Sequence, residues 1–468
     1  MKLARAFVPL LAALLCASAS QAQVQPVDAA ARARDRAIYE HIIDMNTAVS
    51  GGQVPAMAAY LADLFRAGGF TDADIHILPV GSTASLIVRY RGDGTGGRPI
   101  VFMAHMDVVE ARREDWTRDP FKLVEENGYF FGRGALDIKE GVANLSATFL
   151  DLKAQGFTPT RDLILYFSGD EETSGATTIA ALRDHRDLLD AEFALNADAG
   201  GGSLDEITGV ANAYALQTSE KTFASFTLTA HNPGGHSSQP RSDNAIYDVM
   251  DALEHLRAYQ FPVMWNDTTI ASMRAAGSTD SGALGQAMLR FAAHPGDARA
   301  AATLSASPFR VGQVRTTCVP TLLAGGHADN ALPQSAVATV NCRIFPGVPI
   351  ATVQAKIQQL AGPRIVVAPL DQYHSSDASP LRPDVLAAVT TAVHAIHPGV
   401  PVIPAMSAGA SDGVFFREAG IPTYGVADIF IKDTDDFSHG LNERLPVQSF
   451  YDGLTYWRVL IGALAGHP

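Results

Sequence analysis

The sequence predicts an α/β protein in which a large domain, with a mostly parallel central sheet flanked by helices, is interrupted by a smaller α+β domain. Short apolar runs typical of buried strands alternate with helical segments in residues 28–217 and again in 370–468. Residues 218–369 instead contain strands that alternate apolar and polar side chains, as in a sheet with one exposed face. The length of 468 residues also exceeds what one core usually fills.

The first part of the chain starts with two helices and continues with strands and helices in alternation. We expect helices at 28–48 and 54–67, the second ending at Gly68-Gly69. A hairpin-type turn at 93–97 is expected between two of the strands. The expected strands are 74–79, 85–91, 99–104, 162–168 and 193–198, with a strand and a Gly-rich turn in 128–137, and further helices are expected at 139–155 and 177–185. This alternation indicates a doubly wound domain.

The middle part predicts a ferredoxin-like domain, because its elements follow the order βαββαβ. An Ala-rich segment at about 262–310 is an insertion into that order and is expected to be helical. The expected strands are 222–230, 313–323, 335–345 and 365–367, with helices at 243–258 and 352–360. After residue 369 the pattern of the large domain returns, with strands near 400–404 and 422–425 and a closing helix at 446–464.

The N-terminus has the features of a secretory signal peptide, with Lys2 and Arg5 ahead of an apolar run and a small-residue cleavage site near Ala22. Roughly ten apolar residues are too few to cross a bilayer, which needs about 20. We therefore expect a periplasmic or secreted protein with no membrane attachment after cleavage.

The charge and the cysteines limit the partners and the compartment. Removal of Lys2 and Arg5 takes the formal net charge from −14 to −16, which argues against nucleic acid and anionic lipid as partners. After cleavage only Cys318 and Cys342 remain, so neither a disulfide scaffold nor a cysteine metal site is expected. They lie in two strands that pair if the small domain is as predicted, and one disulfide or two buried thiols are both open.

Polar residues gather where the predicted strands of the large domain end. His105 and Asp107 close one strand, and the Glu171-Glu172 pair and Asp198 follow two others. Open α/β sheets build their sites at this edge. Asp137 in the Gly-rich turn and His439 in a C-terminal loop complete the set. Two histidines and three carboxylates suffice for two zinc ions if one carboxylate bridges, which leaves one glutamate to accept a proton from water.

Several motifs resemble those of the M20 metallopeptidase family. They are His-x-Asp, Gly-Arg-Gly-Ala-Leu-Asp-Ile-Lys-Glu-Gly, Gly-Asp-Glu-Glu-Thr-Ser-Gly and Gly-Gly-His-Ser-Ser. Arg-Thr-Thr at 315–317, Ala-Asp-Asn-Ala-Leu-Pro at 328–333 and Asn-Cys-Arg-Ile-Phe-Pro-Gly at 341–347 are most similar to its carboxypeptidase S and secreted N-acyl-amino-acid hydrolase branch. The likeness runs from about residue 30 to the end.

The resemblance implies a role for each residue of this set. One zinc ion would be bound by His105 and Asp198, the other by Glu172 and His439, and Asp137 would bridge both. Co²⁺ or Mn²⁺ could take the place of zinc. Asp107 would orient His105, because a metal-bound histidine is usually held by a second group. Glu171 would be the general base.

The resemblance also implies how the substrate is held. His236 in the small domain would stabilise the oxyanion, often from the partner subunit, so a homodimer through the small domain is implied as well. The substrate carboxylate would be gripped by Asn330, Arg343 and the backbone near Gly409.

Four features bear on how far the family pattern applies. The family commonly has a cis peptide after the bridging aspartate, so Asp137–Ile138 is a candidate. Ile138 stands where many members have a polar residue, and Asp198 where carboxypeptidases of the family often have glutamate, so dipeptide or amino-end specificity stays open. The insertion at 262–310 could cover the usual dimerising face.

We therefore expect an exported dizinc hydrolase that cleaves an amide next to a free carboxylate, in dipeptides, the C-terminal residues of short peptides or N-acyl amino acids. One alternative keeps the fold and changes the bond to a carbamoyl amide or ureide. The other is a periplasmic binding protein without catalysis, which the complete set of ligands and base disfavours.

Overall fold

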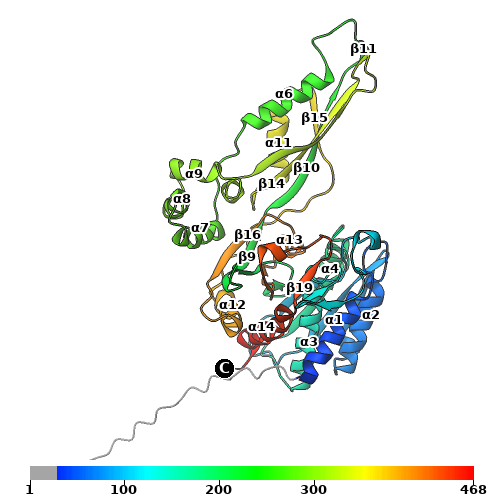
Figure 1. Cartoon of the computed structure of the whole chain (residues 1–468), viewed down its shortest axis with the longest axis vertical. Coiled ribbons are helices and arrows are strands. Elements are labelled where there is room, and N and C mark those ends of the chain that lie inside the picture. Colours follow the sequence, from blue (N-terminus) through cyan, green and yellow to red (C-terminus); the bar gives the residue numbers. More distant parts are fainter. Residues whose placement is uncertain (1–28, 468) are drawn as a thin grey trace, which may run out of the picture.

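The computed structural model describes residues 29–467, so the predicted signal peptide lies outside the described residues. The chain forms two domains, one above the other in Figure 1, with a cluster of inserted helices beside their junction. Within the described residues no helix is long and apolar enough to span a membrane.

The large domain is built on a mixed sheet with the strand order β1-β2-β6-β3-β7-β17-β9-β8-β18, and β16 also pairs with β9. The centre is parallel from β6 through β3 and β7 to β17. The pairs β1–β2, β2–β6 and β8–β9 are antiparallel, and β18 pairs with β8 in parallel. The bounds are β1 Ile75–Val80, β2 Thr83–Tyr90, β3 Ile100–His105, β6 Leu163–Ser168, β7 Phe193–Asn196, β8 Gly201–Leu204, β9 Ala211–Glu220, β16 Val402–Ser407, β17 Thr423–Gly425 and β18 Phe430–Ile431.

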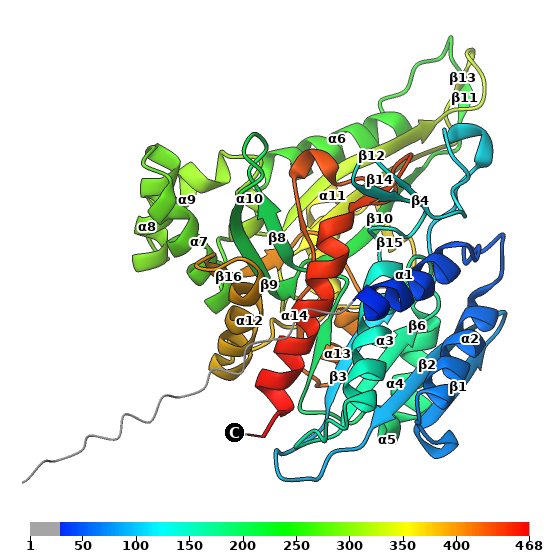
Figure 2. The same cartoon turned by 60° about the horizontal axis from the view of Figure 1, so that its bottom comes forward.

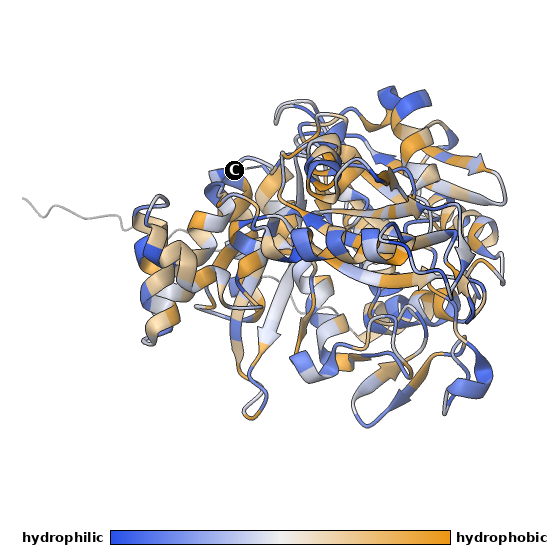
Figure 3. Cartoon of the chain, turned by 90° about the horizontal axis from the view of Figure 1, so that it is seen from above, coloured by the Kyte–Doolittle hydropathy of each residue, from blue (hydrophilic) through white to orange (hydrophobic). Residues whose placement is uncertain are grey.

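Helices cover both faces of this sheet (Figure 2), because successive side chains of a buried strand point to opposite faces. In β3, Phe102 packs with the larger helical layer and Val101 and Met103 with the smaller one. The larger layer contains α1 Ala29–Ile43, α2 Val54–Ala67, α3 Lys139–Ala154, α12 Pro383–Ile396 and α14 Val447–Ala465, and the smaller contains α4 Ala176–Asp184, α5 Arg186–Leu189 and α13 Gly413–Glu418. Loops and helix ends at the periphery are largely hydrophilic (Figure 3).

A small three-stranded sheet, in the order β19-β5-β4, lies beside the main one. Its strands are β4 Val124–Glu126, β5 Tyr129–Phe131 and β19 Arg444–Pro446, and short 3₁₀ turns occur at η1 Asp72–Asp74, η2 Arg113–Asp115 and η3 Asp433–Asp435. Because β5 precedes the Gly-rich turn and β19 follows the His439 loop, this sheet holds two distant segments together.

The small domain has the ferredoxin-like order, with an antiparallel sheet β12-β14-β10-β15. Its elements are β10 Thr222–His231, α6 Ala245–Ala258, β12 Thr317–Gly325, β14 Ser335–Ile344, α11 Ile350–Ala361 and β15 Ile365–Pro369, with the short pair β11 Gly235–His236 and β13 Ala331–Leu332 at its far end. Cys318 and Cys342 lie directly opposite in β12 and β14 and form a disulfide, which decides between the two alternatives left open by the sequence.

The insertion is helical, as expected, and consists of α7 Asp267–Thr279, α8 Ala283–Ala293, α9 Ala298–Ser305 and α10 Val311–Val314. It has its own apolar core around Met288 and Phe291. Although it belongs to the small domain in sequence, α7 packs against β16 of the large sheet. The Thr218 and Thr268 hydroxyls, 2.5 Å apart, join the two parts.

Two expectations about the strands need correction. The turn at 93–97 does not make a hairpin, because β6 lies between β2 and β3 in the sheet. A parallel strand inserted from later in the chain cannot be seen in the local pattern. The strand expected at 193–198 ends at Asn196, and β8 and β9 are additional strands that the pattern did not indicate.

Candidate active site

The residues singled out in the sequence meet at the carboxyl edge of the large sheet. His105 ends β3, while Glu171 and Glu172 follow β6 and Asp198 follows β7. Since β3 pairs in parallel with both β6 and β7, these three strand ends lie side by side. Asp137 joins them from the turn between β5 and α3.

Two groups of side chains in residues 29–467 could hold a metal ion, and the first consists of His105, Asp137 and Asp198. His105 Nε2 lies 3.1 Å from Asp137 Oδ1 and 3.7 Å from Asp198 Oδ1. Burial lowers the pKa of His105, but the carboxylates around it raise that pKa well above its usual range. Burial raises the pKa of Asp198 to about 6, which His105 partly opposes. This group therefore attracts positive charge.

Asp137, Glu172 and His439 form the second group. His439 Nε2 lies 3.1 Å from Asp137 Oδ2 and 3.0 Å from Glu172 Oε2. Hydrogen bonds to these two carboxylates raise the pKa of His439 to about 10. His439 has a left-handed backbone with φ 61°, which is uncommon outside glycine.

The two groups share Asp137, whose two oxygens face different histidines. Oδ1 lies toward His105 and Oδ2 toward His439, which is the arrangement that a bridging carboxylate requires. Imidazole nitrogens and carboxylate oxygens are ligands that suit zinc. The donor set therefore fits two divalent ions. The peptide Asp137–Ile138 is cis, as the resemblance implied.

Asp107 contacts His105 in a different way from the one we expected. The main-chain carbonyl of Asp107 lies 2.9 Å from His105 Nδ1, while the nearer carboxylate oxygen is 3.5 Å away. The carboxylate instead accepts hydrogen bonds from the amides of Glu171 and Glu172, at 3.1 and 3.0 Å. Asp107 belongs to neither metal group, and it fixes both His105 and the segment with the two glutamates.

A buried ion pair, Arg133–Glu443, joins the two loops that supply Asp137 and His439. Their side chains are 3% and 0% exposed, with Arg133 Nη1 donating to Glu443 Oε2 at 2.6 Å. Glu443 also accepts from the amides of Gly134, Leu136 and Asp137. Arg133 in turn donates to the carbonyls of His439 and Gly440. The pair thus holds the bridging carboxylate and the second imidazole in one unit.

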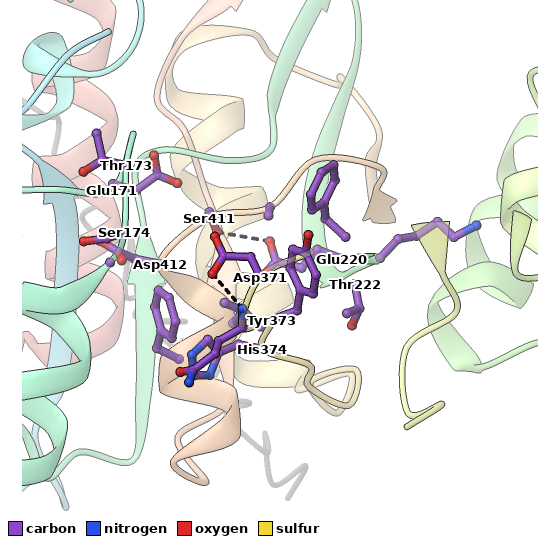
Figure 4. A pocket seen from close by; sticks show the side chains of 17 residues that line it. Glu171, Thr173, Ser174, Glu220, Thr222, Asp371, Tyr373, His374, Ser411 and Asp412 are labelled. Carbon is purple, nitrogen blue, oxygen red and sulfur yellow. Dashed lines mark hydrogen bonds between the residues drawn. The ribbon is translucent and has the colours of Figure 1, made fainter. Parts of the chain in front are cut away.

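Glu171 lies in the wall of a cavity of about 310 Å³ between the two domains. Figure 4 shows its carboxylate on one side, with Tyr373 and His374 from the segment after β15 on the other. Burial and then the charge of Asp198 raise the pKa of Glu171 well above its usual range. Ser411 lines the same cavity.

Arg343 and Gly409 lie beside this cavity. Arg343 donates to the Ala408 carbonyl at 2.7 Å and stacks over Phe223, whose ring centroid is 4.9 Å away. Within residues 29–467 it has no carboxylate partner. The Gly409 amide donates to Ser407 Oγ at 2.9 Å. A guanidinium without an anionic partner suits a substrate carboxylate.

His236 and Asn330 are not brought to the metal groups within one chain. His236 lies in β11, at the end of the small domain farthest from the large one (Figure 1). The Ser237 amide donates to the Asn330 carbonyl, so the two residues are neighbours there. Both are exposed.

The segment that contains all of the candidate metal ligands matches a known family. The profile of peptidase family M20/M25/M40 matches residues 101–463. The chain belongs to this family. It is therefore a hydrolase of the M20 type, and its two metal groups fit a dinuclear site.

Known M20 proteins resemble the chain over most of its length. N-fatty-acyl-amino acid synthase/hydrolase PM20D1 of Xenopus tropicalis is 29% identical over 371 residues, which are 77% of this chain and 71% of that protein. The M20 metallo-carboxypeptidase Sso-CP2 of Sulfolobus solfataricus has a TM-score of 0.69 at 15% identity, over 92% of this chain and 99% of that one. The di-peptidase Dug1p of Saccharomyces cerevisiae has a TM-score of 0.64 at 15% identity, over 94% and 97%. The two structures show the shared fold.

Arg133 and Glu443 are parts of the site that the sequence motifs did not reveal. Arg133 stands in the Gly-Arg-Gly motif and Glu443 is four residues after His439, so both lie close in sequence to residues that the motifs did indicate. The pairing itself joins residues 310 positions apart and appears only in the folded chain.

Proposed function

We propose that this protein is an exported dizinc hydrolase that cleaves an amide bond next to a free carboxylate. The observation on which this rests most is the placement of Glu171 beside two metal groups that share Asp137. A base next to paired metal groups suits attack of water on a carbonyl.

Each of these residues has its own role in the proposed reaction. Two bound zinc ions would supply the Lewis acid that polarises the carbonyl and lowers the pKa of the attacking water. Glu171 takes a proton from that water and returns it to the leaving amine. Because Glu171 belongs to neither metal group, its carboxylate is free to hold the proton between these steps. Arg343, which has no carboxylate partner in residues 29–467, binds the substrate carboxylate.

The proposed substrates are dipeptides and N-acyl amino acids. Support comes from relatives whose names describe an N-fatty-acyl-amino acid synthase/hydrolase and a di-peptidase. The cavity of about 310 Å³ that contains Glu171 suits small substrates of this kind.

A substrate panel tests the proposal directly. The purified protein, loaded in turn with zinc, cobalt and manganese, is assayed on dipeptides, N-acyl amino acids and N-carbamoyl amino acids. We expect turnover of the first two classes. Turnover of N-carbamoyl amino acids alone would select the ureide alternative, and binding without any turnover would select a binding protein.

Export is part of the proposal, supported by the signal-peptide features of residues 1–22 and by the Cys318–Cys342 disulfide. Disulfides persist in oxidising compartments. Fractionation of cells that produce the full chain, followed by N-terminal sequencing of the mature protein, tests export and the cleavage near Ala22.

A homodimer through the small domain also belongs to the proposal. β12 is an edge strand with Val319, Leu322 and Leu323 exposed by 55%, 67% and 64%. A long apolar edge is a template for pairing with another strand, and a copy of itself gives a closed pair. A cavity of about 290 Å³ between α6 and β12 adds apolar surface, and no residue of the insertion lines it. In such a dimer, His236 of one copy would be able to reach the active site of the other copy.

A further inference from the structure

A second cavity, of about 580 Å³, lies beside the one that contains Glu171. It is formed by residues 47–54, the turn between β1 and β2, the residues after β3 and the loop after β6. Four valines face it, Val49, Val54, Val80 and Val108, together with alanines and glycines. We call it the valine groove. Its lining is mainly apolar. The cavity of about 310 Å³ that contains Glu171, which we call the catalytic cavity, is lined by polar and apolar side chains alike.

The two carboxylates in its wall are already satisfied. Asp107 accepts from the amides of Glu171 and Glu172. Asp170 accepts from the Ser174 hydroxyl, the amides that begin α4 and the Thr177 hydroxyl. Because bonded carboxylates have little need of a polar ligand, the groove offers apolar surface rather than a charged site.

The groove adjoins the cavity that contains Glu171. Thr173 and Ser174 line both cavities, directly after Glu171 and Glu172. In the proposed function, Arg343 in β14 of the small domain holds the amino-acid end of the substrate. The acyl group lies on the other side of the scissile bond from that end, and the valine groove is the mainly apolar cavity that adjoins the one containing Glu171.

We infer that the valine groove binds the hydrocarbon chain of an N-acyl amino acid. This inference rests on the proposed function, and it specifies which acyl groups the enzyme would prefer. The cavity on the other side of Asp137 is a poorer candidate, because it measures about 250 Å³ and is lined by Asp137, Asp198 and Asp436. Asp137 and Asp198 are candidate metal ligands, so this cavity belongs to the metal site rather than to an apolar chain.

A chain-length series tests the inference with the zinc-loaded, full mature chain. The substrates are N-acetyl, N-butanoyl, N-hexanoyl, N-octanoyl and N-decanoyl derivatives of one amino acid. Each buried methylene contributes about 0.8 kcal/mol, so kcat/KM should rise by up to about fourfold per methylene until the groove is filled.

Charged substitutions in the two cavities test where the hydrocarbon chain of the substrate binds. Val49→Asp is the main variant, because Val49 is 74% exposed and an aspartate there leaves the core untouched. Val80→Asp is a second variant at the half-buried end of β1. Both should reduce the ratio of kcat/KM for decanoyl over acetyl substrate at least tenfold. Ile431→Asp, in the smaller cavity, is the matched control and should keep the wild-type ratio.

The outcomes separate the inference from the function on which it rests. If no amide in the series is cleaved by the metal-loaded protein, the proposed function fails. If all are cleaved with kcat/KM independent of chain length, only the inference about the groove fails. If Ile431→Asp loses the chain-length dependence and the valine variants keep it, the hydrocarbon chain binds in the smaller cavity. That result would overturn the inference.

Discussion

Individual side chains in this site act through more than one atom. Asp137 presents one oxygen to His105 and the other to His439, and Asp107 uses its carbonyl for His105 and its carboxylate for the two glutamate amides. A residue placed in this way cannot shift without moving several others. Glu171 differs, because it belongs to neither metal group and its carboxylate faces the catalytic cavity.

Glu171→Gln should therefore separate metal binding from turnover. The glutamine keeps the size of the side chain but cannot accept the proton, so we expect kcat/KM to fall by about 10²- to 10⁴-fold. The zinc content, measured on the same samples, should remain that of the wild type. Near-normal turnover in a variant with its full zinc content would contradict the role of Glu171.

At the scale of elements, the site depends on contacts between segments far apart in the chain. β19 pairs with β5, and the Arg133–Glu443 ion pair ties the turn before α3 to the loop before β19. Both contacts bring Asp137 and His439 to the same place. Neither residue of the pair belongs to a metal group.

Glu443→Gln should weaken metal binding without touching a ligand. The change removes the anionic partner of Arg133 and part of the support for Asp137, and losses of this kind typically cost about 10- to 100-fold in metal affinity. Competition with a chelating dye measures the affinity. Asp162→Asn is the control, because Asp162 likewise pairs with an arginine and a backbone amide but lies before β6, at the opposite edge of the sheet. Equal zinc affinities in the two variants would refute a positioning role.

A second contact between elements predicts a pH effect. Glu140 in α3 and Asp428 are both buried, and Asn144 donates to both. Burial, and for Glu140 also the charge of Asp428, raises the pKa of each carboxyl group. The folded protein then binds more protons than the unfolded chain, so this pair stabilises the fold at low pH and loses that contribution as the pH rises through the folded pKa values.

Glu140→Gln should flatten this dependence, since glutamine stays neutral. We expect the free energy of unfolding to fall less between about pH 5 and about pH 8 in the variant than in the wild type. Urea titrations with saturating zinc at both pH values measure it. If the free energy of unfolding of the variant falls as steeply as that of the wild type, the Glu140–Asp428 pair is not the source of the pH dependence.

At the scale of the whole molecule, the small domain carries two features that one chain leaves unused. His236 and Asn330 lie at its far end, and β12 exposes an apolar edge. Pairing of two copies along β12 would account for both. Helix α7 of the insertion packs against β16 of the large domain, and no residue of the insertion lines the cavity between α6 and β12.

Leu323→Arg should convert the proposed dimer to monomers, because it places a charge on the edge that would pair. Light scattering after gel filtration measures the mass. Val366→Arg on β15, the other edge of the same sheet, is the matched control, since Val366 is 59% exposed. A monomeric wild type, or a Leu323→Arg variant that stays dimeric, would rule out this interface.

The sequence by itself determined the order of the main elements, the ferredoxin-like small domain and the metal ligands as candidates. These follow from local patterns: apolar period, turn residues, and polar side chains placed where strands end. His105, Glu172 and Asp198 meet because parallel strands bring their ends to one edge, whereas Asp137 and His439 join them from two loops that the pairing of β5 with β19 holds together.

Only the tertiary structure decided what depends on contacts between distant segments. The position of β6 between β2 and β3, the disulfide, the Arg133–Glu443 pair and the valine groove all join parts of the chain that no local pattern relates. The orienting atom of Asp107 was hidden for another reason, since a main-chain carbonyl is common to every residue and leaves no mark in a sequence. Side-chain types reveal which chemistry is available, and the folded backbone decides which atoms perform it.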